Sequence, residues 1–255
     1  MNVIIVLLYA PERAAATCRI AKDLHRALGG KIVVVINGRR VNHVPLNAEV
    51  IEHDNSGMEF GGYQAGLDTV GDVDRAVIVN DTICHHDTPT STLLRSFVRQ
   101  TTRDLHKFAL GRVYTNTRTM RLQGLESSRW IRTHLFALDG AALRALGNRI
   151  YCPELDSLIT ASPHPDLFFG GVTGEMRDLL SRFLFTPGPY SWYAATPLRA
   201  DNCAAMARKA GAILQEKYLT MRLEAADAGL WDISMSRKDR VIHRAQSYLW
   251  QALHR

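Results

Sequence analysis

The sequence has few cysteines, and none of them are spaced as a pair. Cys18, Cys84, Cys152 and Cys203 lie far apart and form no Cys-x-x-Cys motif. In a chain of 255 residues this argues against a disulfide framework and indicates reduced thiols in the cytosol. No apolar run is long enough to cross a bilayer, and the short run in MNVIIVLLYAPER lacks a basic leader, so a first core strand is expected there, not a signal peptide. We expect a cytoplasmic protein, with peripheral association at the inner face of the membrane left open.

The chain also lacks any concentrated block of one charge. It carries 31 Lys and Arg against 25 Asp and Glu, with a net charge of +6 and a pI of about 9.3. This excess favours anionic partners such as nucleotide phosphates, acidic glycans or anionic lipid surfaces. Because the positive residues are dispersed, with no aromatic-basic module, we expect no nucleic-acid partner. A hydrophobic content of 46% is ample for the core of one globular α/β domain.

The N-terminal half alternates strand-like and helix-like segments. Buried strands are indicated by continuous β-rich runs, and helices by apolar residues at helical spacing. The expected strands are 3–9, 31–36, 48–52 and 75–80, and the expected helices are 14–28 and 59–70. The pair Gly29-Gly30 is expected to end the first helix. This β-α-β-β-α-β order predicts a mostly parallel sheet flanked by helices.

The remainder is less regular. Helices are expected over 90–101, 141–146 and 175–185, and strands over 108–114 and 130–138. Three prolines predict a surface loop over 153–169. Beyond Pro197 the chain is rich in Ala, Arg and Leu, so we expect it to be helical to its end. With no repeat and no low-complexity linker, the sequence indicates one domain carrying a helical C-terminal extension.

The stretch from residue 53 to residue 87 has the strongest functional signal. Its apolar run 76–79 ends abruptly on Asn80-Asp81-Thr82. In open α/β sheets ligands bind outside the carboxyl ends of the strands, where carboxylate and amide oxygens can hold a hard cation and, through it, a diphosphate. Asp81 and Thr82 could equally cap the next turn. From the residues alone the two interpretations have equal weight.

The order of these patches resembles the nucleotide-binding half of a GT-A glycosyltransferase. More narrowly, two segments look like the rhamnan-synthesis type of bacterial polysaccharide glycosyltransferases: DNSGMEFGGYQAGL (54–67) and VIVNDT (77–82). Two later segments are similar to that family's acceptor-side strand and Glu-led helix: WIRTHLFAL (130–138) and GEMRDLLSRFLFTPG (174–188). The resemblance implies a GT-A-like domain over 1–190, divided into a nucleotide-sugar half (1–87) and an acceptor half (88–190), with an extension over 191–255 packed on it.

The resemblance implies roles for the residues at the ends of the strands. Asp81 would ligate Mg²⁺ or Mn²⁺ bridging the donor diphosphate, supported by Asn80 and Thr82. Asp54 and Asn55 would contact the base or the ribose; the alternative is an Asx turn. The remaining donor-side residues would frame the nucleobase or approach the phosphates, with helix packing and an ordinary strand exit as the alternatives: Tyr9, Ala10, Pro11, Arg13, Gly57, Gly61 and Gly62.

Three residues are implied on the acceptor side. Glu175 would be the general base of an inverting displacement; a Glu in the first turn of a helix is also explained by the helix dipole. His134 would bind acceptor or diphosphate, unless it is a hydrogen-bonded core histidine. Asp156 is the second choice for the base. The run Cys84-His85-His86-Asp87 contains metal-binding residue types, but no second cluster supplies further zinc ligands, so the histidines are expected beside the donor site.

This sequence departs from the family pattern in two places. The strand end carries one carboxylate where GT-A enzymes often have Asp-x-Asp, and Glu59 stands where the family has Asp. The resemblance implies a glycosyltransferase acting from a nucleoside-diphosphate sugar onto a surface or capsular polysaccharide or a lipid-linked glycan. The alternatives are a non-catalytic nucleotide-sugar-binding or scaffold protein and a nucleotidyltransferase. The latter class usually has a Gly-rich first loop, which PERAAATC lacks.

Overall fold

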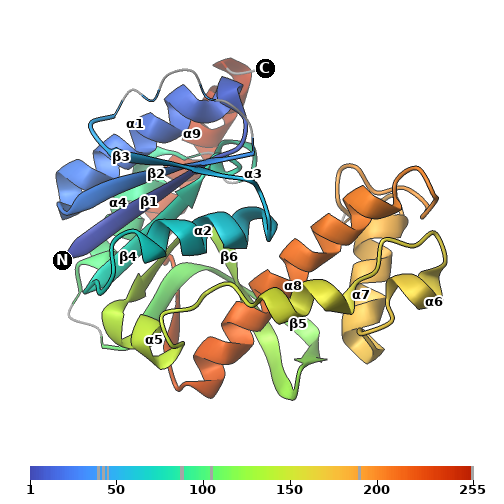
Figure 1. Cartoon of the computed structure of the whole chain (residues 1–255). Coiled ribbons are helices and arrows are strands. Elements are labelled where there is room, and N and C mark those ends of the chain that lie inside the picture. The colour runs from blue at the N-terminus through green and yellow to red at the C-terminus, as the bar shows by residue number, and fades with distance from the viewer. Residues whose placement is uncertain are drawn as a thin grey trace.

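The fold is built around a mixed sheet of seven strands (Figure 1). The structure is a computed structural model and describes residues 1–38, 41, 44, 46–86, 89–103, 106–188 and 191–253. The strand order is β3-β2-β1-β4-β6-β5-β7. The strands are β1 (Asn2–Leu8), β2 (Lys31–Asn37), β3 (Glu49–His53), β4 (Arg75–Asn80), β5 (Phe108–Leu122), β6 (Leu125–Asp139) and β7 (Gly229–Asp232). Only β6 is antiparallel to its neighbours in this sheet; the other pairings are parallel.

Helices cover both faces of the sheet. On one face, α1 (Pro11–Leu28) packs on β1, whose Ile4 and Val6 belong to the same cluster, and α4 (Ser91–Thr101) packs on α1 and β5. On the other face, α2 (Met58–Asp68) packs on β1 and β2, and α5 (Gly140–Ala145) and α8 (Cys203–Ala225) pack on β6. Residues 3–8 of β1 have no exposed surface, and burying each such Val, Leu or Ile side chain is worth roughly 1.5–3 kcal/mol. The predicted GT-A-like α/β fold is therefore confirmed in its element order and mostly parallel sheet.

A third hydrophobic cluster lies beyond the sheet. It joins the far end of the β5–β6 hairpin to η1 (Pro153–Leu158), α6 (Pro165–Phe168), α7 (Gly174–Phe185) and the first half of α8. Met206, Ala210 and Leu214 of α8 lie in this cluster, whereas Leu219 and Leu223 lie in the main core. One helix therefore fixes the position of this part against the sheet. The predicted boundary at residue 190, between a GT-A-like domain and a C-terminal extension, stays a prediction.

The structure corrects three expectations in the less regular half. The strands expected over 108–114 and 130–138 are longer and form a hairpin, closed by Gln123 and Gly124 at φ values of 49° and 76°. The region 153–169 is not only a loop, because it contains η1 and α6. The end of the chain is not helical throughout: β7 lies between α8 and α9 (Arg237–Leu253) and pairs with β5. Within the described residues no helix is long and apolar enough to span a membrane.

Candidate functional site

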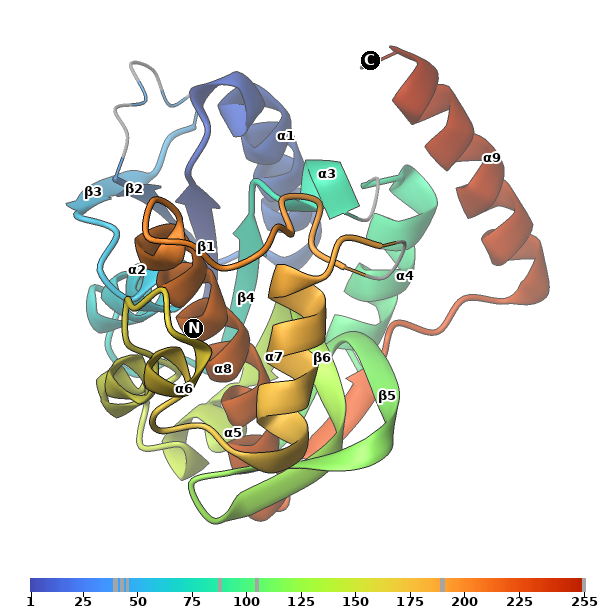
Figure 2. The same ribbon diagram turned by 90° about the vertical axis from the view of Figure 1, so that its right-hand side faces the viewer.

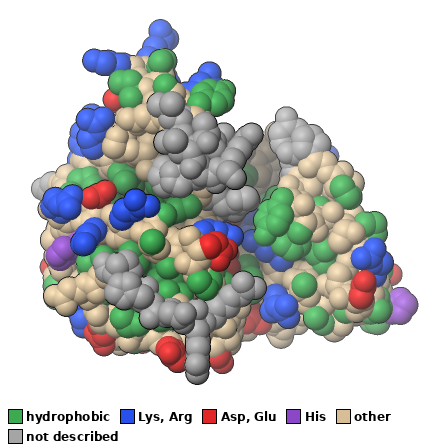
Figure 3. All heavy atoms as spheres, turned by 90° about the horizontal axis from the view of Figure 1, so that it is seen from above, with side chains coloured by type: hydrophobic (Ala, Val, Ile, Leu, Met, Phe, Trp, Pro, Cys, Tyr) green, Lys and Arg blue, Asp and Glu red, His purple; other side chains and the backbone are tan. Residues whose placement is uncertain are grey.

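A large cavity opens at the carboxyl ends of β1, β2 and β4. Its volume is about 1350 Å³, enough for a ligand larger than a typical drug-sized molecule. From above, the surface is hollowed between the larger part of the molecule and the smaller right-hand part (Figure 3). The rim on the strand side contains Tyr9, Ala10, Glu12, Arg13, Asn37, Gly38, Asn55, Met58, Glu59, Asn80, Asp81 and Thr82. The opposite wall comes from β6, α7, α8 and residues 186–188 and 191–193.

Asp81 lies directly after β4 and joins this strand to the end of β1. Its side chain has no exposed surface, and its Oδ2 accepts hydrogen bonds from the backbone N–H groups of Tyr9 (2.7 Å) and Ala10 (2.6 Å). Its Oδ1 has no hydrogen-bond partner and lies 3.9 Å from Arg13 Nη1. Burial raises the pKa of Asp81, although the two N–H groups and Arg13 act in the opposite direction. One carboxylate oxygen therefore shapes the loop, and the other is left for a positive group.

Asn80 is used by the fold. Its Oδ1 accepts from the backbone N–H of Thr82 at 3.0 Å and from the Thr82 hydroxyl, and its Nδ2 donates to the Tyr63 hydroxyl. Tyr63 in turn donates to the backbone oxygen of Thr133 at 2.8 Å. Both lone-pair directions of the Asn80 amide oxygen are occupied, so a metal would find no free oxygen on this side chain. The network instead links β4 to β6 through Tyr63 of α2.

Tyr9 and Asn55 meet on the same rim. The Tyr9 hydroxyl donates to Asn55 Oδ1, which also accepts from Asn37 Nδ2 at 3.0 Å. Asn37 is held in turn by His53, whose Nδ1 lies 2.7 Å from its Oδ1. Burial, followed by the nearby Glu59 and Asp81 carboxylates, raises the pKa of Tyr9, so its hydroxyl stays protonated and can donate. Asn55 and Asp81, both implied by the resemblance to be donor-side residues, therefore lie on one rim and are joined through Tyr9.

Asp54 does not take part in this convergence. Its side chain is 79% exposed and is not among the residues lining the cavity. Oδ1 accepts from the backbone N–H of Ser56 at 2.9 Å, which makes the Asx turn that was the alternative interpretation. The Ser56 side chain, followed by its backbone N–H, lowers the pKa of Asp54 through hydrogen bonding. Pro11, at the first position of α1, is also absent from the lining, whereas Tyr9, Ala10 and Arg13 line the cavity, and their role in donor binding stays a prediction.

The three glycines expected beside the donor instead allow close packing of α2. A Cβ on Gly57 would lie 2.5 Å from the ring of Tyr151, one on Gly61 would overlap the backbone oxygen of Ser56, and one on Gly62 would overlap the side chain of Leu7. None of the three lines the cavity. The packing alternative therefore accounts for all of them.

The wall opposite the rim is basic. Its charged lining residues are Arg132 on β6, Arg182 on α7, and Lys209, Glu216 and Lys217 on α8. The strand-side rim has the opposite balance, with three carboxylates and one cation among its lining residues. A bound cation, and through it a phosphate group, is thus favoured at the rim, and a further anionic group at the wall.

Lys217 is the most buried charge of this wall. Its side chain is 5% exposed, its Nζ lies 3.3 Å from the centre of the Trp130 ring and 3.3 Å from Glu216 Oε1. Burial lowers the pKa of Lys217 to about 8, against the attraction of Glu216. Thr133 Oγ1 donates to the other oxygen of Glu216 at 3.3 Å. A lysine and a carboxylate are therefore held side by side over an aromatic ring, facing the strand-end rim.

The three residues expected on the acceptor side fare differently. His134 on β6 lines the cavity and is 6% exposed. Glu175 begins α7 outside the lining and accepts from Arg118 Nη1 at 2.7 Å. Asp156 is also outside the lining; it accepts from the Tyr151 hydroxyl and from Gln215 Nε2 at 3.3 Å. Four carboxylates line the cavity, those of Glu12, Glu59, Asp81 and Glu216, and none of them was predicted as the catalytic base.

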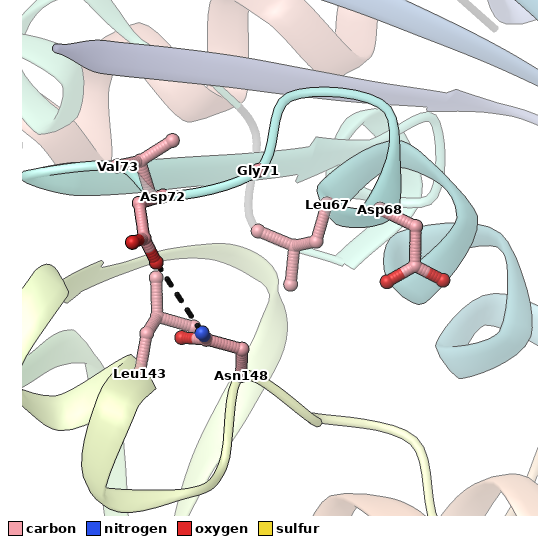
Figure 4. A pocket seen from close by; sticks show the side chains of 7 residues that line it. All are labelled: Leu67, Asp68, Gly71, Asp72, Val73, Leu143 and Asn148. Atoms are coloured by element: carbon pink, nitrogen blue, oxygen red, sulfur yellow. Dashed lines mark hydrogen bonds between the residues drawn. The ribbon is translucent and has the colours of Figure 1, made fainter.

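Two other regions carry metal-binding residue types or a cavity. Among the described residues no group of three His, Cys, Asp or Glu side chains could hold a metal ion; of the run 84–87, only the Cys84 side chain is described, and burial raises its pKa. A smaller cavity of about 370 Å³ lies between α2 and α5, lined by Leu67, Asp68, Gly71, Asp72, Val73, Leu143 and Asn148 (Figure 4). It precedes β4, at the opposite edge of the sheet from the strand ends.

No family model and no curated protein matches the sequence. Among solved structures, the chain is similar to 2-C-methyl-D-erythritol 4-phosphate cytidylyltransferase from Thermus thermophilus (11% identity, 95% of this chain and 98% of that chain, TM-score 0.37). It is similar to the enzyme of the same description from Francisella tularensis (11%, 97% and 100%, TM-score 0.41) and to a hypothetical transferase from Thermus thermophilus (19%, 62% and 73%, TM-score 0.36). At these values the likeness is too distant to transfer a substrate or a residue role.

Proposed function

We propose that this protein is a glycosyltransferase that moves a sugar from a nucleoside-diphosphate donor to a surface or capsular polysaccharide or a lipid-linked glycan. The observation that carries the proposal is the cavity itself. It unites the ends of β1, β2 and β4 with a basic wall from β6, α7 and α8. Ligands of open α/β sheets bind at this edge, and a donor and an acceptor need two facing surfaces.

The donor is proposed to lie along the strand-side rim. The amide nitrogen of Asn55 and the hydroxyl oxygen of Tyr9, both on the cavity rim, offer a donor and an acceptor to a base or ribose, and Asn37 holds Asn55 in place. Arg13, 3.9 Å from Asp81, is placed to meet a diphosphate. These contacts hold the leaving group on the sheet side and leave the sugar pointing toward the basic wall.

A divalent cation, Mg²⁺ or Mn²⁺, fits the rim through one protein oxygen. Asp81 Oδ1 is buried, without a hydrogen-bond partner, and would be that ligand. Mg²⁺ is commonly held by one or two carboxylates together with substrate phosphates and water. When bound, such a cation neutralises negative charge on a departing diphosphate. Asn80 and Thr82 support the site by shaping the strand end.

Glu216 replaces Glu175 and Asp156 as the proposed general base. It lines the cavity, whereas the other two carboxylates are bonded elsewhere. Thr133 and Lys217 orient its two oxygens. A carboxylate in this position can accept the proton of an acceptor hydroxyl as that oxygen attacks the sugar, which gives inversion. His134, on the same wall, is proposed to contact the acceptor or the diphosphate.

The experiment is a panel of nucleoside-diphosphate sugars incubated with the purified protein, with and without Mn²⁺. Nucleotide release by the wild type that is lost in Glu216→Gln but kept in Glu175→Gln supports the proposal, and both variants should retain donor binding. A matched panel of nucleoside triphosphates with sugar phosphates reports pyrophosphate release. Pyrophosphate in place of nucleoside diphosphate would overturn the proposal in favour of a nucleotidyltransferase.

A non-catalytic nucleotide-sugar-binding protein is the second candidate. The observation that favours it is the small number of oxygens available to a metal at the rim. Asp81 uses one oxygen to accept from backbone N–H groups, and the described residues contain no group of three metal-binding side chains. A thermal shift with a nucleotide sugar, without turnover in the presence of acceptor glycans, would support this candidate.

A further inference from the structure

The C-terminal helix α9 has an outer face of unusual composition. The helix runs along α4 with its far end away from the sheet (Figure 2). The exposed residues of this face include four cations and two large apolar side chains: Arg237, Lys238, Arg240, Val241, Arg244 and Tyr248. Val241 and Tyr248 are seven residues apart, so they lie on one side of the helix, and they are 71% and 68% exposed. The described part of the molecule covers neither.

The inner face of α9 is fixed by polar contacts. Thr90 Oγ1 lies 2.7 Å from His243 Nδ1, Arg112 lies 3.3 Å from His243 Nε2, and Gln246 donates to Ser91 Oγ at 3.1 Å. These contacts join the helix to the start of α4 and to β5. The rotation of α9 about its axis is thereby set, and the basic and apolar face points outward.

The acid on the described part of α9 does not offset this charge. Asp239 accepts from Ser236 Oγ at 2.8 Å, which lowers its pKa, and its backbone N–H donates to the same Ser236 hydroxyl at the start of the helix. It is two residues before Val241, which places it on the opposite side of the helix from the apolar strip. An apolar strip flanked by cations, without an acid, is complementary to an anionic lipid surface: the apolar side chains enter the acyl boundary and the cations meet the headgroups.

We propose that the outer face of α9 binds the surface of an anionic lipid bilayer. A second copy of the chain is a poorer occupant, because two such faces would bring four cations against four. A nucleic acid or an acidic glycan would use the cations but would give no reason for Val241 and Tyr248 to stand in water. The proposal does not depend on the reaction proposed above, since no residue of this face lines the large cavity.

The test is vesicle co-sedimentation of the full chain. One vesicle preparation is phosphatidylcholine alone, and in the other about a third of the lipid is phosphatidylglycerol. The wild type should sediment with the anionic vesicles and stay in solution with the neutral ones. Raising the salt from about 0.1 M to 0.5 M should release it, because the Debye length shortens. Equal binding to both preparations would overturn the proposal.

Two variants and a matched control sharpen the test. Replacing Arg237, Lys238, Arg240 and Arg244 by Gln should weaken anionic-vesicle binding by about 100-fold or more. The double variant Val241→Ser, Tyr248→Ser removes only the apolar strip and should weaken binding without altering the charge. The control replaces four exposed arginines elsewhere by Gln and should bind like the wild type: Arg26, Arg118, Arg121 and Arg199.

The outcomes of these measurements distinguish membrane binding by α9 from the alternatives. Binding that survives in both α9 variants, or that falls as far in the control, would show that the helix face is not the contact. Light scattering is measured on the same samples. A dimer that dissociates in the double variant, with no vesicle binding by the wild type, would assign the face to self-association instead. Thermal unfolding confirms that the variants are folded, which is expected because the replaced side chains are exposed.

Discussion

The substitution Asp81→Ala separates the structural work of this carboxylate from its proposed role in binding. Asp81 Oδ2 accepts from two backbone N–H groups, those of Tyr9 and Ala10, at 2.7 and 2.6 Å inside the protein. Alanine would leave both donors without a partner, and each such loss costs about 1–3 kcal/mol. For two donors the expected loss in the free energy of unfolding is roughly 2–6 kcal/mol. The net loss is smaller, because the substitution also removes a buried charge. We expect urea unfolding to show a lower midpoint for Asp81→Ala with an unchanged slope.

The control is Asp81→Asn, which keeps the shape and one acceptor oxygen. It should recover most of the lost stability, yet remain unable to hold a cation beside a diphosphate. Burial raises the pKa of Asp81 in the folded state above its usual 3.8, so the folded protein binds this proton more tightly than the unfolded chain. The stability of the wild type relative to Asp81→Asn should therefore increase as the pH is lowered through the raised pKa, and level off below 3.8. The reasoning is refuted if Asp81→Ala unfolds at the wild-type midpoint, or if Asp81→Asn is as unstable as Asp81→Ala.

Three further predictions concern the cavity and its support. Burial lowers the pKa of Lys217 from 10.5 to about 8, so between these pH values the unfolded chain binds more protons than the folded protein. The free energy of unfolding of the wild type should therefore rise with pH across this window. Urea titrations at several pH values should show this rise for the wild type and not for Lys217→Met. Glu175→Gln should cost less than about 1 kcal/mol in the free energy of unfolding, because its pair with Arg118 is at the surface; a larger loss would mean that the pair is structural. Gly62→Ala should cost about 1–3 kcal/mol through overlap with Leu7, while the affinity for nucleotide sugar, measured by calorimetry on the folded protein, should stay near that of the wild type.

The central strands could be predicted because their burial leaves a direct mark on the sequence. β1, β2 and β4 are covered on both faces, so their residues form continuous apolar runs. β7 leaves no such mark: it has four residues, three of them exposed, and forms through pairing with β5. The outer part of the β5–β6 hairpin is likewise polar and exposed over much of its length. Tertiary contacts, not local pattern, set these elements.

The candidate site was predictable on one side only. The ends of parallel strands must meet at one edge, which brings Asn55 and Asp81 to the same rim. Glu216 and Lys217 come from α8, far along the chain, and adjacent Glu and Lys residues on a helix have the appearance of an ordinary solvated surface. Only the packing of α8 over Trp130 reveals their position. Glu175 was expected from family resemblance, but its place in the first turn is explained by the helix dipole.

The central claim is that one ligand spans the strand-side rim and the basic wall. A crystal structure of the protein soaked with the nucleotide sugar selected by the panel tests it most directly. We predict density with the base near Tyr9 and Asn55, the diphosphate beside Arg13 and Asp81, and the sugar directed toward Glu216 and Lys217. Density confined to the small cavity between α2 and α5, or a nucleotide bound with its diphosphate away from Asp81, would contradict the account.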